Sequence, residues 1–171
     1  TGECRADKMI YFPQGTHNIN LVGDFTIETW LYMLENGGAT RRDIFSTKSF
    51  TSSNVQISLG LNYYANPDPS HSNIPHFFIH VQNNPLDHLV GTTNLQPRQW
   101  HHLAGVKRGN TLLLFVNGKM EASETIPFTI PDNLNSEIAI GAHPVSGQPY
   151  SERNLGGIVE EMHISNTARY T

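Results

Sequence analysis

The chain has 171 residues, with 11 Lys and Arg against 15 Asp and Glu and a formal net charge of −4. This length fits one domain with a sizeable core, and the acidic balance excludes electrostatic attraction to nucleic acid. Asn, Ser and Thr number 42 while the helix formers Ala, Lys and Glu number 21, so the composition favours strands and turns over a helical bundle. No run approaches the roughly 18 consecutive apolar residues of a membrane span, so we expect no transmembrane segment.

Short stretches in which apolar and polar residues alternate predict a series of β-strands. One apolar run ends in Asn117-Gly118, a pair that accepts the two positive φ angles of a type I′ turn, and therefore predicts a hairpin over 111–119. In chain order, the other predicted strands are Lys8–Phe12, Asp24–Leu34, Asp43–Ser49, Asn54–Leu61, His76–Gln82, Gln99–Lys107, Glu137–Gly141 and Ile158–Ser165.

About a dozen strands in one domain predict an all-β fold, a two-sheet antiparallel β-sandwich. We expect residues 1–171 to be a single domain, and a piece of a larger protein because the chain begins at Thr1. Two connections, Tyr63–Pro75 and Ala142–Gly157, are expected to be long and irregular. Loops of this kind on a rigid sandwich are common binding regions.

Three segments carry a family resemblance. Residues 23–31 read GDFTIETWL, residues 100–118 read WHHLAGVKRGNTLLLFVNG, and residues 157–171 read GIVEEMHISNTARYT. Together they resemble the concanavalin A-like lectin/glucanase superfamily, in its laminin G-like branch of bacterial extracellular and phage tail-associated proteins. The resemblance implies a jelly-roll sandwich and an extracellular, cell-surface or virion location. The superfamily holds lectins, glycosidases and protein-binding modules, so the fold does not decide the function.

The carboxylates do not form the pattern expected of an enzyme. Glucanases of this superfamily set an E-x-D-x-x-E arrangement on one strand so that an acid and a nucleophile face the groove. That arrangement is missing here. The nearest pairs are Glu121 with Glu124 and the adjacent Glu160 and Glu161, which we expect to point to opposite faces of a strand. No Ser lies in a Gly-x-Ser-x-Gly turn, so we expect a non-catalytic protein.

The histidines favour structural roles. His76 and His80 are four apart on a predicted strand, which separates their rings by about 13 Å and excludes a shared metal, so we expect a polar sheet face. His101 and His102 follow Trp100, and the resemblance implies that this Trp is a core residue and that the dipeptide packs and forms hydrogen bonds.

Glu160 is the carboxylate that could bind a metal. It shares strand parity with Ile158, Met162 and Ile164, and a carboxylate on an apolar face needs a partner. The resemblance implies a structural calcium ion held by a carboxylate of the last strand, and Glu160 is the matching residue. The alternative is that Glu160 accepts hydrogen bonds from backbone amides or pairs with an arginine.

Sugar binding requires aromatic faces together with polar side chains that bond hydroxyl groups. The two long loops supply both kinds, and the predicted ligand-binding residues are Tyr64, Asp68, His71, Tyr150 and Arg153. The alternative is that their tyrosines only pin the loops onto the sandwich. Trp30 could line a groove, but the resemblance implies a core residue. These observations predict a glycan-binding module, and the alternative is a structural module with a protein partner.

Overall fold

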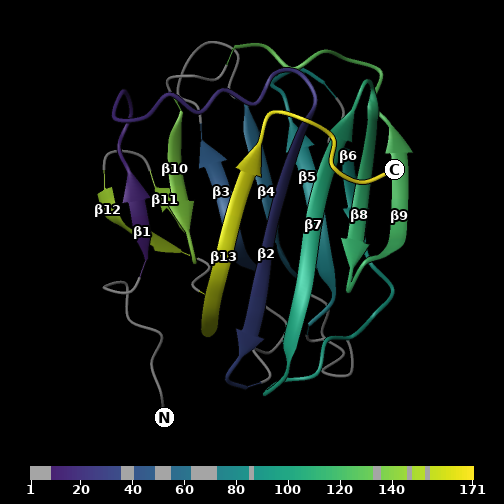
Figure 1. Cartoon of the computed structure of the whole chain (residues 1–171). Helices are drawn as coiled ribbons and strands as arrows, with labels where there is room; N and C mark the ends of the chain where they lie inside the picture. The colour runs from purple at the N-terminus through teal and green to yellow at the C-terminus, as the bar shows by residue number, and fades with distance from the viewer. Residues whose placement is uncertain are drawn as a thin grey trace.

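The structure is a computed structural model that describes residues 9–35, 41–48, 55–62, 73–84, 87–132, 136–145, 148–152 and 155–171. Two antiparallel sheets stack face to face (Figure 1). The six-stranded sheet has the order β1 (Ile10–Phe12), β10 (Glu137–Ile140), β3 (Arg42–Lys48), β4 (Gln56–Leu61), β5 (Pro75–His80) and β6 (Asp87–Val90). The five-stranded sheet has the order β13 (Gly157–Ser165), β2 (Phe25–Met33), β7 (Trp100–Arg108), β8 (Thr111–Val116) and β9 (Lys119–Thr125).

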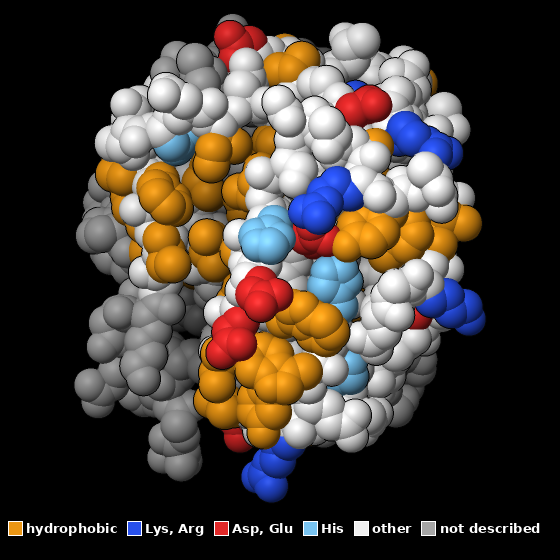
Figure 2. Space-filling view, in the orientation of Figure 1, with side chains coloured by type: hydrophobic (Ala, Val, Ile, Leu, Met, Phe, Trp, Pro, Cys, Tyr) orange, Lys and Arg blue, Asp and Glu red, His pale blue; other side chains and the backbone are white. Residues whose placement is uncertain are grey.

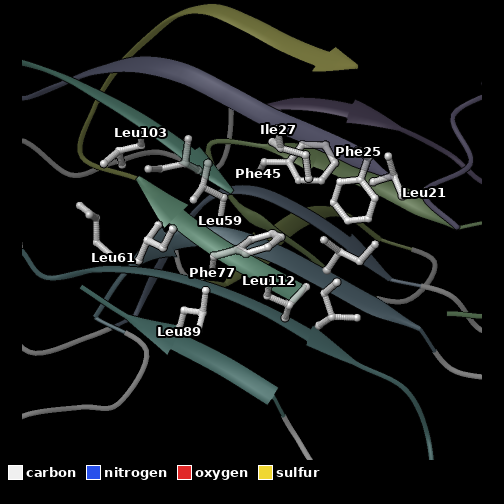
Figure 3. Close-up of a cluster of buried hydrophobic side chains, with 14 of the residues drawn as sticks. Leu21, Phe25, Ile27, Phe45, Leu59, Leu61, Phe77, Leu89, Leu103 and Leu112 are labelled. Atoms are coloured by element: carbon white, nitrogen blue, oxygen red, sulfur yellow. The ribbon is translucent and has the colours of Figure 1, made fainter. Parts of the chain in front are cut away.

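The core lies between the two sheets and is built from the inward positions of both. Figure 3 shows Phe25, Ile27 and Leu103 of the five-stranded sheet facing Leu59 and Phe77 of the six-stranded sheet. All five side chains are at most 1% exposed, so burial of these apolar surfaces supplies the main driving force for the fold.

Gly105 allows the two sheets to approach closely. A Cβ built at this position would lie 2.5 Å from a ring carbon of Phe77, much closer than two carbon atoms can pack. The absence of a side chain at Gly105 therefore lets the Phe77 ring fill the space between β5 and β7.

The predicted sandwich is confirmed, and most predicted strands lie within two residues of the observed bounds. The type I′ turn is also confirmed, since Asn117 and Gly118 have φ angles of 50° and 79°. The prediction of an irregular connection over Ala142–Gly157 was wrong. Strands β11 (His143–Val145) and β12 (Gln148–Glu152) pair there as an antiparallel hairpin, and β11 lies against β3.

Within the described residues there is no helix long and apolar enough to cross a membrane.

Candidate functional site

The outer face of the five-stranded sheet carries an unusual concentration of aromatic side chains. This face looks toward the viewer in Figures 1 and 2. Antiparallel pairing aligns residues of β13, β2 and β7 in rows, and alternate positions along each strand share the outer face. One row consists of Glu160, Trp30 and His102, and the next consists of Ile158, Tyr32 and Trp100.

The C-terminal residues 166–171 cover one part of this face (Figure 1). The Thr26 hydroxyl donates to the carbonyl oxygen of Thr167 (2.8 Å) and accepts from the backbone N–H of Arg169 (3.0 Å). Ala168 and Tyr170 pack on a small apolar cluster of the outer face, whose buried members are Ala104, Val106, Leu113 and Phe115. The tail therefore supplies a second, smaller hydrophobic layer over β7 and β8.

Glu28 is the polar centre of the covered part. Its carboxylate is almost fully buried and accepts a hydrogen bond from the Tyr170 hydroxyl. Arg169 Nη1 lies 2.6 Å from Glu28 Oε1, and His102 Nε2 lies 3.4 Å from Oε2. His163 Nδ1 approaches to 3.9 Å from the other side. The positive and hydrogen-bonding groups of this face are thus directed at Glu28.

Burial, followed by the hydrogen bond to Glu28 and the negative charge of that carboxylate, raises the pKa of Tyr170 to about 12. The phenol therefore stays protonated at neutral pH and remains a donor to Glu28. This interaction ties the end of the chain to the middle of β2.

The rest of the face is open, and two indole rings dominate it. Trp30 is 40% exposed and Trp100 is 41% exposed. Each is supported by a neighbouring ring, with centroid distances of 5.2 Å for Trp30 and His102 and 5.3 Å for Tyr32 and Trp100. Figure 2 shows hydrophobic side chains gathered over the lower part of β2 and β7, with acidic and histidine side chains beside them.

A shallow hollow of about 330 Å³ lies on this open part. Its lining consists of Trp30, Trp100, Glu160 and Glu161. Partly exposed aromatic rings can stack on the flat face of a ligand. The neighbouring carboxylates can accept hydrogen bonds from its polar groups. The arrangement is suited to recognition of a small polar group that has at least one apolar face.

The two glutamates reach the same hollow because β13 contains a bulge. The pairing register with β2 shifts between Glu160 and His163, and Glu161 has a φ angle of 50°. A bulge adds one residue and redirects side chains, so the alternation of faces is broken. The expectation that Glu160 and Glu161 point to opposite faces was therefore wrong.

The same bulge corrects the parity argument for Glu160. Its side chain is exposed and shares the outer face with Ile158, whereas Met162 and Ile164 pack against the core. Before the bulge the outer positions are even-numbered, and after it they are odd-numbered. Glu160 is thus not a carboxylate on an apolar face, and no described residue pairs with its side chain.

Calcium at Glu160 stays a prediction, but the described surroundings do not fit it. Calcium is held by six to eight oxygen ligands in proteins. Two of the four side chains around the hollow are indoles, and the Glu160 carbonyl oxygen already accepts from the Thr29 hydroxyl at 2.8 Å. Among the described residues no group of three or more His, Cys, Asp or Glu is positioned to hold a metal ion.

The prediction that Trp30 and Trp100 are core residues was wrong. The inward positions of β2 are Phe25, Ile27, Leu31 and Met33, so Trp30 takes the outer face as its parity indicates. The outer face at this end of the sheet is not covered by the tail, and both indoles therefore remain in contact with solvent. Strand parity was the correct signal for Trp30, and the family resemblance was the misleading one.

The polar face predicted around His76 exists but is buried. His76 and Ser58 on the outer face of the six-stranded sheet are fully buried, together with Asp43. The Asp43 carboxylate accepts from Arg41 Nε (2.8 Å) and from the Ser58 hydroxyl (3.0 Å), and His143 Nδ1 lies 3.2 Å away. We call these five residues, Arg41, Asp43, Ser58, His76 and His143, the Asp43 cluster.

The Asp43 cluster keeps its carboxylate charged. Burial alone would raise the pKa of Asp43, but the hydrogen bond from His143 and the charges of Arg41 and His76 hold it well below its usual range. His143 reaches Asp43 because the β11–β12 hairpin, which the sequence did not predict, packs on β3. A network with its partners supplied internally serves stability rather than ligand binding.

Most of the predicted loop site lies outside the described residues. This holds for Tyr64, Asp68, His71 and Arg153, and for the side chain of Tyr150, whose backbone belongs to β12. Those five residues stay predictions. The residues of the open aromatic face that the sequence did not single out as a site are Tyr32, Trp100, His102 and Glu161.

A second hollow opens between the edges of the two sheets, where β1 and β10 stand beside β13. It has a volume of about 340 Å³, and its side chains are apolar, among them Ile10, Ile140, Val159 and Met162. Ile10 is 56% exposed, so part of the sandwich edge presents hydrophobic surface to solvent, as the left side of Figure 2 shows.

A family model described as the concanavalin A-like lectin/glucanases superfamily matches residues 6–170. A search of curated proteins finds no match. Solved structures share the fold. Domains LG4–5 of the mouse laminin α1 chain align with a TM-score of 0.64 and 10% identity, over 94% of this chain and 40% of that chain. This chain thus spans less than half of the laminin fragment.

Two further similar structures are bacterial and hold sugars. The CBM40 of the Ruminococcus gnavus IT-sialidase, bound to α2,3-sialyllactose, aligns with a TM-score of 0.63 and 12% identity, over 94% of this chain and 90% of that one. Domain 4 of an extracellular GH43 arabinanase from Geobacillus stearothermophilus, in complex with arabinotriose, aligns with a TM-score of 0.61 and 18% identity, over 94% and 67%. At these identities the likeness establishes a shared fold.

Proposed function

Because this chain belongs to the concanavalin A-like lectin/glucanase superfamily, we propose that it is a non-catalytic module that binds glycans through the open aromatic face of its five-stranded sheet. The observation that carries the proposal is the pair of half-exposed indoles, Trp30 and Trp100, which line one hollow. A contiguous exposed patch of large aromatic side chains is typical of a ligand or partner site.

The geometry of the face suits a sugar. A pyranose has an apolar side that stacks on an aromatic ring and a rim of hydroxyls that require acceptors and donors. Trp30 and Trp100 provide the rings, and the carboxylates of Glu160 and Glu161 provide acceptors beside them. His102 packs against Trp30 and Tyr32 packs against Trp100 on the same face of the sheet, so the platform is preformed.

Sugar complexes among the structural neighbours support the same class of ligand. One of these neighbours is a domain of an extracellular arabinanase, which supports an extracellular, cell-surface or virion location for the protein that carries this module. The open form of the hollow supports a non-catalytic role. Glycosidases enclose an acid and a nucleophile around the scissile bond, whereas Glu160 and Glu161 are both exposed on a shallow surface.

A glycan array probed with the isolated domain, followed by titration of the best ligand, tests the proposal. Trp30→Ala and Trp100→Ala should each weaken binding about tenfold or more, since loss of one stacking ring removes on the order of 1.5 kcal/mol. Met120→Ala is the matched control, because Met120 is 50% exposed on β9 of the same sheet. Absence of binding to every glycan at high protein concentration would overturn the function, and full binding by both Trp variants would overturn the site.

A protein partner is the second candidate, and one observation favours it. The apolar hollow between β1, β10 and β13 is lined in part by Ile10, which is 56% exposed. Exposed apolar surface of this kind is typical of protein contacts. If Ile10→Asp abolishes a stable complex with a protein partner but retains glycan binding, this edge of the sandwich is the protein-binding surface.

A further inference from the structure

The two glutamates of the hollow have no positive partner within the described part of the chain. The described ion pairs of this face all end on Glu28, which is paired with Arg169 at 2.6 Å and approached by His102 and His163. No described Lys, Arg or His lies within ion-pair distance of Glu160 or Glu161. The hollow therefore combines two uncompensated carboxylates with two indole faces.

The backbone holds both carboxylates at this position at a cost. Glu161 lies in the left-handed region with a φ angle of 50°, which a residue with a Cβ adopts only under constraint. A regular strand would place one of two adjacent glutamates on the core side, and the bulge instead brings both to the hollow. The bulge therefore concentrates two like charges on one open surface, beside the two indoles.

The chemistry of this lining selects the charge of its ligand. Carboxylate or phosphate groups would be repelled by Glu160 and Glu161. A calcium ion takes six to eight oxygen ligands, and two of the four side chains that line the hollow are indoles, which offer none. An organic ammonium group can interact favourably with all four side chains. The carboxylates attract its charge and accept hydrogen bonds from its N–H groups. The indole faces attract it by cation–π interaction, for which Trp is the best ring.

We infer that the hollow of Trp30, Trp100, Glu160 and Glu161 binds the ammonium group of an amino sugar with a free amine. This inference rests on the proposed glycan-binding function and names its ligand class. A sugar is favoured over a lysine side chain because two exposed indoles line the hollow and can stack on the apolar side of a pyranose beside its ammonium group, whereas a lysine offers only a flexible methylene chain. The free amine, rather than the sugar in general, is the group that the two glutamates recognise.

The test compares glucosamine oligomers with N-acetylglucosamine oligomers of the same length, by isothermal titration at mildly acidic pH. Acetylation removes the charge and leaves the ring unchanged. The free-amine oligomer should bind about tenfold more tightly, and its affinity should fall with added salt. In Glu160→Gln/Glu161→Gln the preference should disappear, while the control Glu124→Gln, at an exposed carboxylate of β9, should retain it.

The outcomes separate this inference from the proposed function. Equal affinity for both oligomers, or binding of an array glycan without an amine in preference to the glucosamine oligomer, would overturn the ammonium inference and leave glycan binding intact. Tighter binding of a lysine peptide, with the same dependence on Glu160 and Glu161, would contradict the claim that the ammonium group belongs to a sugar. Binding that requires calcium and is abolished by EDTA would contradict the claim that the hollow binds an organic ammonium group. Absence of binding to any glycan would overturn both proposals.

Discussion

The outer faces of the two sheets hold their carboxylates in opposite environments. On the six-stranded sheet, Asp43 is fully buried and receives hydrogen bonds or charge from Arg41, Ser58 and His143. On the five-stranded sheet, Glu160 and Glu161 are exposed in a hollow, next to half-open indoles and without a described ionic partner. Loss of one partner from a buried ion pair is strongly destabilising, so Asp43 belongs to the fold, whereas an exposed carboxylate without such partners is available to a ligand.

Glu28 shows how a carboxylate on the outer face of the five-stranded sheet becomes buried and paired. It is on the same outer face as Glu160, yet the C-terminal tail brings Arg169 and Tyr170 to it and buries it. The tail thus divides one sheet face into a closed structural part and an open part. On this division, loss of a closed carboxylate should destabilise the fold and loss of an open one should not.

The largest expected effect is loss of stability when the Asp43 cluster is broken. Asp43→Ala removes the carboxylate that faces the half-buried Arg41 and the buried His143, and we expect the free energy of unfolding to fall by about 3–5 kcal/mol. Urea denaturation of the variant and of the exposed control Glu124→Gln measures this. A loss below about 1 kcal/mol would contradict the assignment of the Asp43 cluster to stability.

Acidification should act through the same residue. Because the pKa of folded Asp43 is held below that of the unfolded chain, the stabilisation is present at neutral pH and is lost as pH falls through the ordinary carboxyl range and below. We expect the native protein to lose on the order of 2 kcal/mol more than Asp43→Asn over this range. Parallel stability-versus-pH curves for the two proteins would contradict the expectation.

A smaller effect is expected at the tail. Tyr170→Phe removes the hydroxyl that bonds the Glu28 carboxylate, and we expect a loss of about 1 kcal/mol in urea denaturation. The raised pKa of Tyr170, about 12, means that this stabilisation is present below the pKa of a free tyrosine and is lost as pH rises through about 12. Burial and the carboxylate of Glu137 also raise the pKa of Tyr11 to about 12, so ultraviolet titration should show two late tyrosinates among the described tyrosines, and Tyr170→Phe should remove one of them.

The smallest expected effect on stability is at the open carboxylates. Glu160→Gln/Glu161→Gln should change the free energy of unfolding by less than about 0.5 kcal/mol, because both side chains are exposed and no described residue pairs with them. Urea denaturation is the measurement. Destabilisation as large as that of Asp43→Ala would show that these glutamates are structural and would remove the contrast between the two faces.

Local patterns were sufficient to predict much of the fold. The alternation in residues 25–33 predicted the strand and its inward side, and Asn117-Gly118 predicted the hairpin turn, because both depend on nearest neighbours in the chain. The short strands β6, β11 and β12 were missed. Each has only three to five residues, too few for a clear alternation, and β11 and β12 also contain Pro144 and Pro149. The Asp43 cluster was missed with them, because β11 supplies His143.

By itself, the sequence determined the all-β sandwich, its family and the outward parity of Trp30, since these follow from alternation, turn chemistry and the order of three characteristic segments within one chain. Only the tertiary structure decided what lies over each outward residue. The β11–β12 hairpin contacts one outer face, the tail covers part of the other, and a single extra residue in β13 turns Glu160 and Glu161 to the same side. Coverage and bulges depend on contacts between residues far apart in the chain, which periodicity does not encode.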